Sequence, residues 1–397
     1  MHVLIIPSWY PIDSQSISGI FFREQALSIS RSGIKVGLVS PHLQSLKNLT
    51  GFQSSDTKTG FYAYDDDGIK THVYYGWDWS FKISSIRYYH WLKIGMTLFE
   101  NYVTAEGYPE LIHAHCVLLG GILAHQIKRR YGIPFIITEH SSIFARHPLK
   151  NSLKSSCREV FSESSSNIVV SPALGEFLER EFSHKFFKWW WIPNPLSRIF
   201  ENAFFSQRFL TAESSEREKG FVFLNIGVSN KNKGQDNLIK AFSMAFKGSK
   251  KVRLEIGGDG PYLKPLKELV RQEELEEQVL FLGRLGREQV LHKLLQADAL
   301  VLSSHYETFG IVLIEALACG KPVVATRCGG PECIVDQTNG LLVETNNIQD
   351  LSLAMLDIQK NIATYDRISI RNSCIEKFGQ ATVISQIKKV YSTVLNE

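Results

Sequence analysis

Two glutamates, Glu307 and Glu315, stand on either side of a predicted helix start, with seven residues between them. The apolar run Ala299–Leu302 before them is short enough to be a buried strand. After Gly310 the apolar residues recur at helical spacing, at Val312, Leu313, Ala316 and Leu317. Strand, loop and helix in this order form a parallel crossover, and such sheets bind ligands outside the carboxyl ends of their strands. We therefore expect Glu307 in that crevice and Glu315 two turns into the helix.

The same helix start is a predicted phosphate site. The first backbone N–H groups of a helix have no partner within the helix, and the helix dipole favours an anion at that end. The groups concerned are those of Phe309, Gly310, Ile311 and Val312.

Two glycine turns follow other predicted strands in this half of the chain. One begins at Gly227 and carries Lys233 just before a predicted helix over 235–246, an arrangement that suits a diphosphate. The other contains Gly258 and Gly260 but lacks the Gly-x-Gly-x-x-Gly spacing of a dinucleotide-binding loop. Both turns are therefore predicted to border the same ligand crevice.

The first half of the chain repeats the alternation of strands and helices. Val3–Ile6 is predicted as the first strand, and Gly19 precedes the helix that follows it. Gly19 fits both a simple turn and a close backbone approach to a ligand. Two later strands lead into His115 and His140. If these strands are parallel neighbours, the two imidazoles converge on one crevice, where an imidazole can donate or accept a hydrogen bond.

Composition describes a globular protein of two domains. The chain has 397 residues, of which 44% are hydrophobic and 21% charged. A net charge of +4 without a basic tail or stripe argues against a nucleic-acid partner. The six cysteines show no Cys-x-x-Cys spacing, which argues against zinc or a disulfide framework and favours the cytoplasm. The apolar start is a predicted strand rather than a secretion signal, and no apolar run is long enough to span a bilayer.

Three further segments carry alternative interpretations. Residues 44–70 are predicted as a surface loop, in which Asp65-Asp66-Asp67 is a solvated charge cluster rather than a metal site. A predicted helix over 81–102 interleaves aromatic residues with Lys82, Arg87 and Lys93. This pattern fits a core-facing helix, and it also fits a membrane surface. In Trp189-Trp190-Trp191, alternation along a strand predicts that at least one ring is exposed.

The stretch from His305 to Gly330 resembles the signature of retaining nucleotide-sugar glycosyltransferases of family 4, also called glycosyl transferases group 1. Besides the two glutamates, the resemblance rests on Thr308-Phe309-Gly310, on the Ala-Cys-Gly-Lys-Pro-Val-Val-Ala segment and on the Gly329-Gly330-Pro331-Glu332 turn. It covers nearly the whole chain and is strongest over 221–345. It implies an α/β fold of two Rossmann-like domains facing a cleft, the GT-B fold.

The resemblance implies an acceptor-binding domain over 1–195, with a helix over 380–397 packing back on it. A nucleotide-sugar-binding domain is implied over 196–379, and its polar residues 196–219 form the linker between the two. By this resemblance Gly19 faces the cleft between the domains.

Residue by residue, the resemblance assigns Glu307 to the sugar hydroxyls and Glu315 to the ribose. Lys233 and the amides at 309–312 are assigned to the diphosphate, and His115 to the surroundings of the transferred sugar. Glu307, His115 and Lys233 are therefore the candidate catalytic residues.

The remaining donor contacts implied by the resemblance are the turns at Gly227, Gly258 and Gly260 and the backbone near Arg284. One departure is that Val228 stands where the family has arginine. Lys231 and Arg327 are the candidates to replace that positive charge.

The implied activity is transfer of a sugar, with retention and without a metal or other cofactor, from a UDP- or GDP-linked donor. The implied acceptor is a carbohydrate or a lipid-linked carbohydrate, reached in the cytoplasm or from the inner membrane surface. A nucleotide-sugar epimerase of GT-B fold and a non-catalytic sugar-nucleotide-binding protein remain alternatives. A dinucleotide oxidoreductase is a weaker alternative, because it would need the glycine spacing that is missing here.

Overall fold

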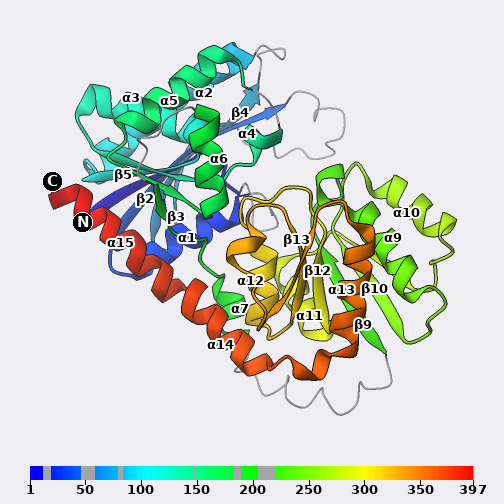
Figure 1. Ribbon diagram of the computed structural model, residues 1–397. Helices are drawn as coiled ribbons and strands as arrows, with labels where there is room; N and C mark the ends of the chain where they lie inside the picture. Colours follow the sequence, from blue (N-terminus) through cyan, green and yellow to red (C-terminus); the bar gives the residue numbers. More distant parts are fainter. Residues whose placement is uncertain are drawn as a thin grey trace. The chain divides into compact units, whose positions relative to one another are not determined.

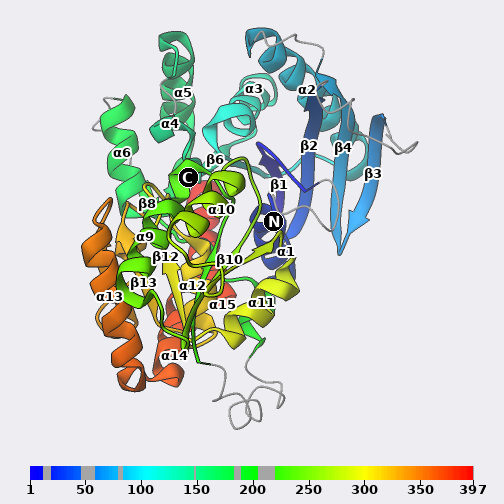
Figure 2. The same cartoon turned by 90° about the vertical axis from the view of Figure 1, so that its right-hand side faces the viewer.

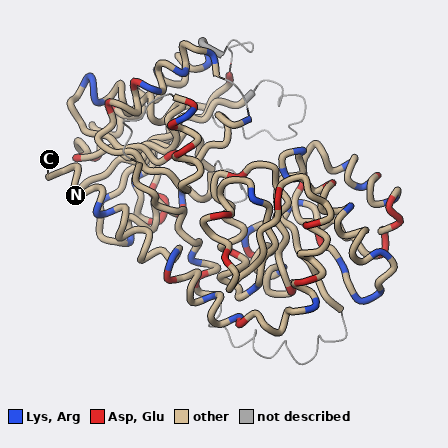
Figure 3. Tube along the Cα trace, in the orientation of Figure 1, with Lys and Arg blue, Asp and Glu red and all other residues tan. Residues whose placement is uncertain are grey.

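A computed structural model describes residues 1–11, 19–45, 59–78, 84–146, 149–182, 189–203 and 220–396. The chain divides into two compact units. The first unit comprises Met1–Val170, Gly175–Ile192 and Ile384–Glu397, and the second comprises Ser171–Leu174 and Pro193–Val383. Basic and acidic residues are interspersed along the described chain of both units, without a long stripe of one sign (Figure 3).

The first unit is built on an eight-stranded sheet with the order β3-β4-β2-β1-β5-β6-β7-β8 (Figure 1). All neighbouring strands are parallel except β3, which runs antiparallel to β4. Its central strands β1, β5 and β6 are almost entirely buried, as strands covered on both faces are. The strands are β1 His2–Pro7, β2 Lys35–Ser45, β3 Gly60–Asp66, β4 Ile69–Asp78, β5 Leu111–His115, β6 Phe135–Glu139, β7 Ser166–Val169 and β8 Trp189–Trp191.

Helices cover both faces of this sheet. On one face α2 packs beside α3, and α3 beside α5. On the other, α15 is tied to the end of α1 by a hydrogen bond from Lys388 Nζ to the carbonyl of Ser32. The helices of this part of the chain are α1 Ile20–Arg31, α2 Ser84–Glu106, α3 Ile122–Tyr131, α4 Ile143–Arg146, α5 Asn151–Glu163, α6 Pro172–Phe182 and α15 Gln380–Asn396.

The prediction of a surface loop over 44–70 was wrong in the part that the structure describes. Gly60–Asp66 and Ile69–Asp78 form a β-hairpin, with β3 at the edge of the sheet (Figure 2). Its turn places Asp67 at φ 52° and Gly68 at φ 91°. Asp-Gly is the dipeptide that favours such two-residue hairpin turns, so the signal was present in the sequence. Residues 46–58 of the predicted loop lie outside the described residues.

The three aspartates of this hairpin have protein partners. Asp66 accepts hydrogen bonds from Arg23 Nε at 2.7 Å and from the Tyr10 hydroxyl at 3.0 Å. Asp65 accepts from the Gly68 amide at 2.6 Å, and Asp67 accepts from Arg23 at 3.0 Å. Asp66 is therefore an anchor for α1 rather than a solvated charge.

The second unit is a six-stranded parallel sheet with the order β11-β10-β9-β12-β13-β14. The strands are β9 Phe221–Ile226, β10 Val252–Gly257, β11 Val279–Gly283, β12 Ala299–Leu302, β13 Val323–Arg327 and β14 Gly340–Glu344. The helices are α7 Arg198–Glu201, α9 Gln235–Phe246, α10 Leu263–Gln272, α11 Arg287–Gln296, α12 Ile311–Ala318, α13 Ile348–Lys360 and α14 Arg367–Phe378.

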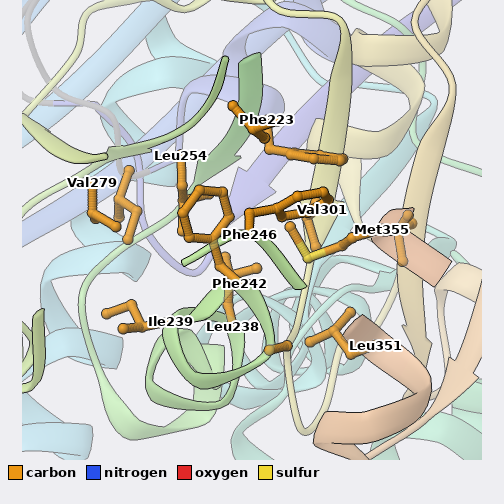
Figure 4. Packing of buried hydrophobic residues seen from close by; sticks show 14 of the residues in the cluster. Phe223, Leu238, Ile239, Phe242, Phe246, Leu254, Val279, Val301, Leu351 and Met355 are labelled. Carbon is orange, nitrogen blue, oxygen red and sulfur yellow. The ribbon is translucent and has the colours of Figure 1, made fainter. Parts of the chain in front are cut away.

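The core of the second unit lies between this sheet and the layer of α9, α10 and α13 (Figure 4). Phe242 and Phe246 of α9 pack with Phe223 of β9, and Met355 of α13 joins them. Burial of aromatic and aliphatic side chains on this scale is the main favourable term in the folding of such a unit. The two sheets with their covering helices confirm the predicted α/β class with two Rossmann-like parts.

The expected polar linker over 196–219 was wrong in its described part. Leu196 and Phe200 are buried, and Phe200 lies on α7, which packs against α11 and α12. Arg371 of α14 donates to the carbonyl oxygens of Phe200, Glu201 and Ala318, which fixes this short helix to the second unit. Residues 204–219 lie outside the described residues.

The helix predicted over 81–102 begins at Ser84 in the described chain and extends to Glu106, while Phe81 and Lys82 lie outside it. Its later aromatic residues face the core, since Trp91 is 4% exposed and donates from its ring to the carbonyl of Pro41. Its first turns differ, because Ile86 is 50% and Tyr89 70% exposed. At the other sheet edge Trp190 and Trp191 are about half exposed, as alternation predicted for at least one of the three rings. Among the described helices, none is both long enough and apolar enough to cross a bilayer.

Acidification is expected to destabilise the first unit through His113 of β5. Its ring is fully buried between Thr138 Oγ1 and the hydroxyl of Tyr391, each 2.7 Å away, and burial lowers its pKa to about 3. A depressed pKa means that the neutral ring favours the folded state. Its contribution is present above the unfolded-state pKa of about 6.5 and is lost as the pH falls towards 3. For one such group, the free energy of unfolding falls by about 2 kcal/mol when the pH is lowered from about 7 to about 5.

Thermal unfolding of wild type and of His113→Gln at neutral and mildly acidic pH measures this effect. The loss of Tm on acidification should be smaller in the variant, whatever its Tm at neutral pH. His292→Gln is the control, because His292 is exposed on α11. An equal acid-induced loss in wild type and His113→Gln would contradict the assignment.

Candidate functional site

The second sheet has an open crevice where its winding reverses. From β9 the chain builds outwards to β10 and β11, and it then returns to β12 on the other side of β9. The loops after β9 and β12 therefore leave the same sheet edge in opposite directions, and ligands of parallel sheets bind between such loops. Lys233 comes from the loop after β9 and Glu307 from the loop after β12.

Lys233 and Glu307 meet at this switch point. Lys233 Nζ donates to Glu307 Oε1 at 2.5 Å, and the side chains are 26% and 15% exposed. The same carboxylate oxygen accepts a second hydrogen bond, from Ser304 Oγ at 2.7 Å. No other described residue donates to the Glu307 carboxylate. Oε2 is therefore available to a hydroxyl group of a ligand.

Hydrogen bonds between backbone and side chains hold the two loops together. The His305 amide donates to the carbonyl of Asn232 at 2.8 Å, and Asn232 Nδ2 donates to the carbonyl of Tyr306 at 2.9 Å. Gly234 has φ +56°, and a Cβ there would lie 2.1 Å from the Ser303 carbonyl oxygen. Only glycine fits this conformation and this close approach. The spacing between the Lys233 and Glu307 side chains is therefore set by backbone contacts.

The backbone of Glu307 is fixed from its other side by the turn after β13. The Glu307 amide donates to the Cys328 carbonyl at 3.0 Å, and the Gly330 amide donates to the Glu307 carbonyl at 2.9 Å. These bonds form an isolated parallel bridge between Glu307 and Gly329. The Gly329-Gly330 turn noted in the sequence thus places the catalytic candidate directly.

The start of α12 lies next to this bridge. Gly310 is the N-cap, Phe309 is buried, and Ile311 and Val312 are partly exposed. The Leu313 amide already donates to the Gly310 carbonyl at 2.9 Å. The amides of the first helical residues therefore remain the predicted anion-binding groups of this end.

Glu315 occupies a different environment from Glu307. It is the fifth residue of α12, just over one turn from its start rather than the expected two. Its side chain is 4% exposed, and it accepts a hydrogen bond from Arg287 of α11 at 2.5 Å. The Arg287 guanidinium in turn lies 4.8 Å from the ring centre of Phe200. Sequence reasoning missed Arg287, because nothing in the α11 sequence marks it as a partner of Glu315.

The glycine turns at the carboxyl ends of β9, β10 and β11 are stacked. The Gly227 amide donates to Gly257, and the Gly258 amide donates to Gly283 at 2.7 Å. A Cβ on Gly258 would lie 1.9 Å from the Gly227 carbonyl oxygen, which explains the glycine. These contacts bring together the predicted donor-site turns at Gly227 and Gly258, and the Tyr262 amide ties the turn at Gly260 to the Ser229 carbonyl at 2.9 Å.

The charged residues near these turns differ in exposure. Arg284 follows β11 directly and is exposed. Val228, which replaces the family's arginine, is 55% exposed. Lys231 is exposed in the same loop, whereas Arg327 lies 3.4 Å from Glu344 in an ion pair. Of the two candidate replacements, Arg327 is paired with an acidic side chain, whereas Lys231 forms no ion pair with another described residue.

The first sheet has its own switch point, between β1 and β5. Ser8 follows β1, and its hydroxyl donates to the His115 carbonyl at 2.8 Å and accepts from the Gly120 amide at 3.1 Å. The strands that lead into His115 and His140, β5 and β6, are parallel neighbours as predicted. His115 Nδ1 lies 3.0 Å from His140 Nε2. The sequence therefore predicted this pair of imidazoles correctly.

His115 is the inner member of the pair. It is fully buried, its ring centre lies 5.0 Å from that of Phe22, and its Nε2 has no hydrogen-bond partner among the described residues. Burial, with His113 and His140 nearby, holds its pKa well below the usual value, so the ring is neutral. Gly19, also predicted in the site, is the N-cap of α1, three residues before Phe22.

Glu139 is a first-unit residue that sequence reasoning did not place in the site. Its buried carboxylate accepts from the amides of Val117 at 2.8 Å, His140 at 3.0 Å and Ser141 at 2.8 Å. Burial raises its pKa, and these amides counteract the rise. The carboxylate joins the loop after β5 to the loop after β6. A charged residue ending an otherwise apolar strand was the available signal.

One group of potential metal ligands occurs among the described residues. His125, Glu159 and Glu163 each place a ligand atom within 4.8 Å of the others. Existing contacts account for them, since His125 Nε2 lies 2.8 Å from Glu163 and Arg129 lies 3.6 Å from Glu159. These residues lie on α3 and α5.

Comparison with known proteins identifies the family. Residues 23–197 match the model described as Glycosyltransferase Family 4, and residues 206–373 match the model described as Glycosyl transferases group 1. An uncharacterized glycosyltransferase of Methanocaldococcus jannaschii is 28% identical over 302 residues, which cover 75% of this chain and 78% of the relative. The N-acetyl-alpha-D-glucosaminyl L-malate synthase of Bacillus anthracis is 32% identical over 190 residues, covering 46% of this chain and 48% of that enzyme.

A solved structure of similar fold spans the entire chain. Sucrose-phosphate synthase from Thermosynechococcus elongatus has a TM-score of 0.80, with 18% identity, covering 100% of this chain and 99% of that one. At this identity the likeness concerns the fold, and it confirms the predicted GT-B class. Because the two family models together match both halves of the chain, this protein belongs to the family 4, group 1 glycosyltransferases.

Proposed function

We propose that this protein is a retaining, metal-independent glycosyltransferase. It moves a hexosyl group from a UDP- or GDP-linked donor to a carbohydrate or lipid-linked carbohydrate, in the synthesis of a surface polysaccharide or glycolipid. The observation that carries the proposal is the pairing of Lys233 with Glu307 at the β9/β12 switch point. It places a cation and a hydrogen-bond acceptor side by side, as a sugar diphosphate requires.

In this proposal the donor spans the second-unit crevice. Lys233 and the amides at the start of α12 bind the diphosphate, and Glu307 Oε2 accepts a hydrogen bond from a sugar hydroxyl. Glu315, held by Arg287, is the proposed contact for the ribose, and the backbone at Arg284 for the base. The role of His115 stays the one that the family resemblance implies, near the transferred sugar. Its ring is neutral and fully buried, so we propose that it positions neighbouring groups rather than contacting the sugar itself.

The proposed chemistry proceeds on one face of the sugar. The acceptor oxygen forms a bond to the anomeric carbon as the bond from that carbon to the diphosphate oxygen breaks. The acceptor proton passes to the leaving diphosphate, so no separate base is needed. Positive charge from Lys233 and preorganised amides stabilise the negative charge that develops on the leaving group. A glycosidase-like pair of carboxylates is not part of this scheme.

Glu307→Gln is expected to lower kcat while leaving the Kd for the nucleoside diphosphate largely unchanged. The amide keeps the shape but loses the charge-assisted hydrogen bond to the sugar, which corresponds to about a 10- to 100-fold lower rate. Donors are first found by thermal shift with UDP- and GDP-sugars, and transfer is then measured with a panel of acceptors.

The matched control is Glu255→Gln. Glu255 of β10 pairs with Lys293 of α11 at 2.9 Å, and the two side chains are 14% and 25% exposed. The control variant therefore loses an ion pair similar in length and exposure to that of Lys233 and Glu307. Turnover by Glu307→Gln at the wild-type rate would contradict the role of Glu307, and with it the proposed function. Conversion of the nucleotide sugar without acceptor would favour the epimerase, and binding without any turnover would favour the non-catalytic alternative.

Activity is expected to survive EDTA. Lys233 and the start of α12 supply positive charge at the diphosphate, and the aspartates of the β3–β4 hairpin bind Arg23, Tyr10 and Lys70 instead. Turnover is measured before and after chelation, and after addition of Mn²⁺ or Mg²⁺. Loss of turnover on chelation that Mn²⁺ restores in wild type, but not in Asp65→Asn, would show that the hairpin holds a metal.

We further propose that the first turns of α2 contact an anionic membrane surface that carries the acceptor. Ile86 and Tyr89 are exposed there, and Arg87 and Lys93 are exposed beside them. Each basic residue near an anionic surface contributes about 1 kcal/mol, so the exposed apolar side chains are needed for stable attachment. Arg87 also lies 3.2 Å from Asp78, which reduces the charge available to lipid.

Wild-type protein is expected to sediment with anionic liposomes at low salt and to be released by high salt. Tyr89→Ser combined with Lys93→Glu should reduce sedimentation. Ile368→Ser is the control, because Ile368 is 59% exposed on α14 and takes no part in the proposed surface. Wild type that stays in the supernatant at low salt, with and without donor, would indicate a soluble acceptor.

A further inference from the structure

Ser304 lies between the sheet and the proposed catalytic carboxylate. It is 1% exposed, and its hydroxyl donates to Glu307 Oε1 at 2.7 Å. Its own carbonyl accepts a hydrogen bond from Thr326 Oγ1 of β13 at 2.6 Å. Thr326 is 3% exposed, so both side chains are held within the packed edge of the sheet. The hydroxyl of Ser304 is thus presented to Glu307 from a rigid position.

The other donor to Glu307 has two competing partners. Lys233 Nζ donates to Glu307 Oε1, and in the proposed function it also contacts the donor diphosphate. A diphosphate carries more negative charge than a single carboxylate, so its arrival draws the ammonium group away from Glu307. Without a second donor, the carboxylate would then lose the contact that orients it.

We propose that Ser304 is a positioning residue that keeps the Glu307 carboxylate oriented when the donor diphosphate engages Lys233. This inference rests on the proposed function and extends it to a residue that contacts neither sugar nor phosphate. A serine hydroxyl suits the task because it donates to the carboxylate without adding a charge that would compete for the diphosphate. With Oε1 held by Ser304, Oε2 stays directed at the sugar.

The neighbouring serine shows what a purely structural hydroxyl does in this loop. Ser303 is also buried, and its Oγ donates to the backbone carbonyl of Lys233 at 2.9 Å. That bond holds two loops together without touching a charged side chain. The hydroxyl of Ser304, by contrast, donates to the Glu307 carboxylate, and the backbone carbonyl of Ser304 accepts a hydrogen bond from Thr326.

The test is a double-mutant cycle of Ser304→Ala and Glu307→Gln, measured by kcat for transfer and by the Kd of UDP and GDP. In the wild-type background Ser304→Ala should lower kcat by about 10-fold, the loss expected for one hydrogen bond to a charged group. It should leave the Kd of the diphosphate unchanged. In the Glu307→Gln background it should have a smaller effect on kcat, because the amide oxygen accepts a weaker hydrogen bond from Ser304 than the carboxylate does.

Two variants keep this result interpretable. Ser243→Ala removes a serine-to-carboxylate hydrogen bond of the same length, from Ser243 to Glu273 at 2.7 Å, away from the crevice, and should retain full kcat. Ser304→Cys fills the buried volume with a much weaker donor, and it should show the loss in kcat even if Ser304→Ala unfolds.

The possible failures are distinguishable. Wild-type kcat in Glu307→Gln would overturn the proposed function itself. A reduced kcat in Glu307→Gln, together with wild-type kcat in Ser304→Ala or Ser304→Cys, would overturn only the positioning role. Equal fold losses from Ser304→Ala in both backgrounds would likewise overturn it, since a general structural defect acts independently of Glu307.

Discussion

The reversal of winding in a parallel sheet is the constraint on which both proposed sites depend. Each sheet starts in its middle, at β1 or β9, builds to one side and then returns to the other, at β5 or β12. Loops leaving the two central strands must diverge, because their helices lie on opposite faces. Ser8, Lys233 and Glu307 lie in these divergent loops, and His115 is the last residue of β5. Chemistry-bearing side chains from distant parts of the sequence thus meet without any special pairing signal between them.

At the second switch point, burial separates the roles of two chemically identical side chains. Glu307 keeps one oxygen without a described donor and is partly exposed, which suits contact with a ligand that comes and goes. Glu315 is almost fully buried, and its charge is held there in an ion pair with Arg287. The surrounding glycine turns are required by backbone packing, since a Cβ at Gly234 or Gly258 would overlap a neighbouring carbonyl oxygen.

Much of this arrangement could be predicted from the sequence, because it follows from local pattern. Strands β1 and β12 and helices α9 and α12 were predicted from apolar runs and periodicity, and Lys233 and Glu307 from their place before helices. Elements of weaker pattern were missed, among them α10, α14 and the β3–β4 hairpin. The sequence of β3 is rich in exposed tyrosine and aspartate, so this strand has no buried face to find. Its Asp67-Gly68 turn was the usable signal.

Long-range partners could not be predicted in this way. Nothing near Glu315 in the sequence points to Arg287, and nothing near His113 points to Tyr391. Likewise the depth of His115 depends on Phe22 and on the neighbouring strands, so a strand-end histidine expected at the surface of a crevice is instead fully buried. Such properties arise from packing between distant elements rather than from residue type.

The path of the chain through the first unit has a consequence for the order of folding during synthesis. Residues 384–396 belong to this unit although they follow the whole of the second, and Tyr391 supplies a buried hydrogen bond to His113 in the sheet. Chains emerge from the ribosome amino-terminus first, and domains tend to fold as they become complete. The first sheet therefore emerges early but reaches its final packing late, after the second unit has emerged. Until α15 arrives, the buried ring of His113 lacks one of its two partners, and the face that Tyr391 later covers stays open to water and to chaperones.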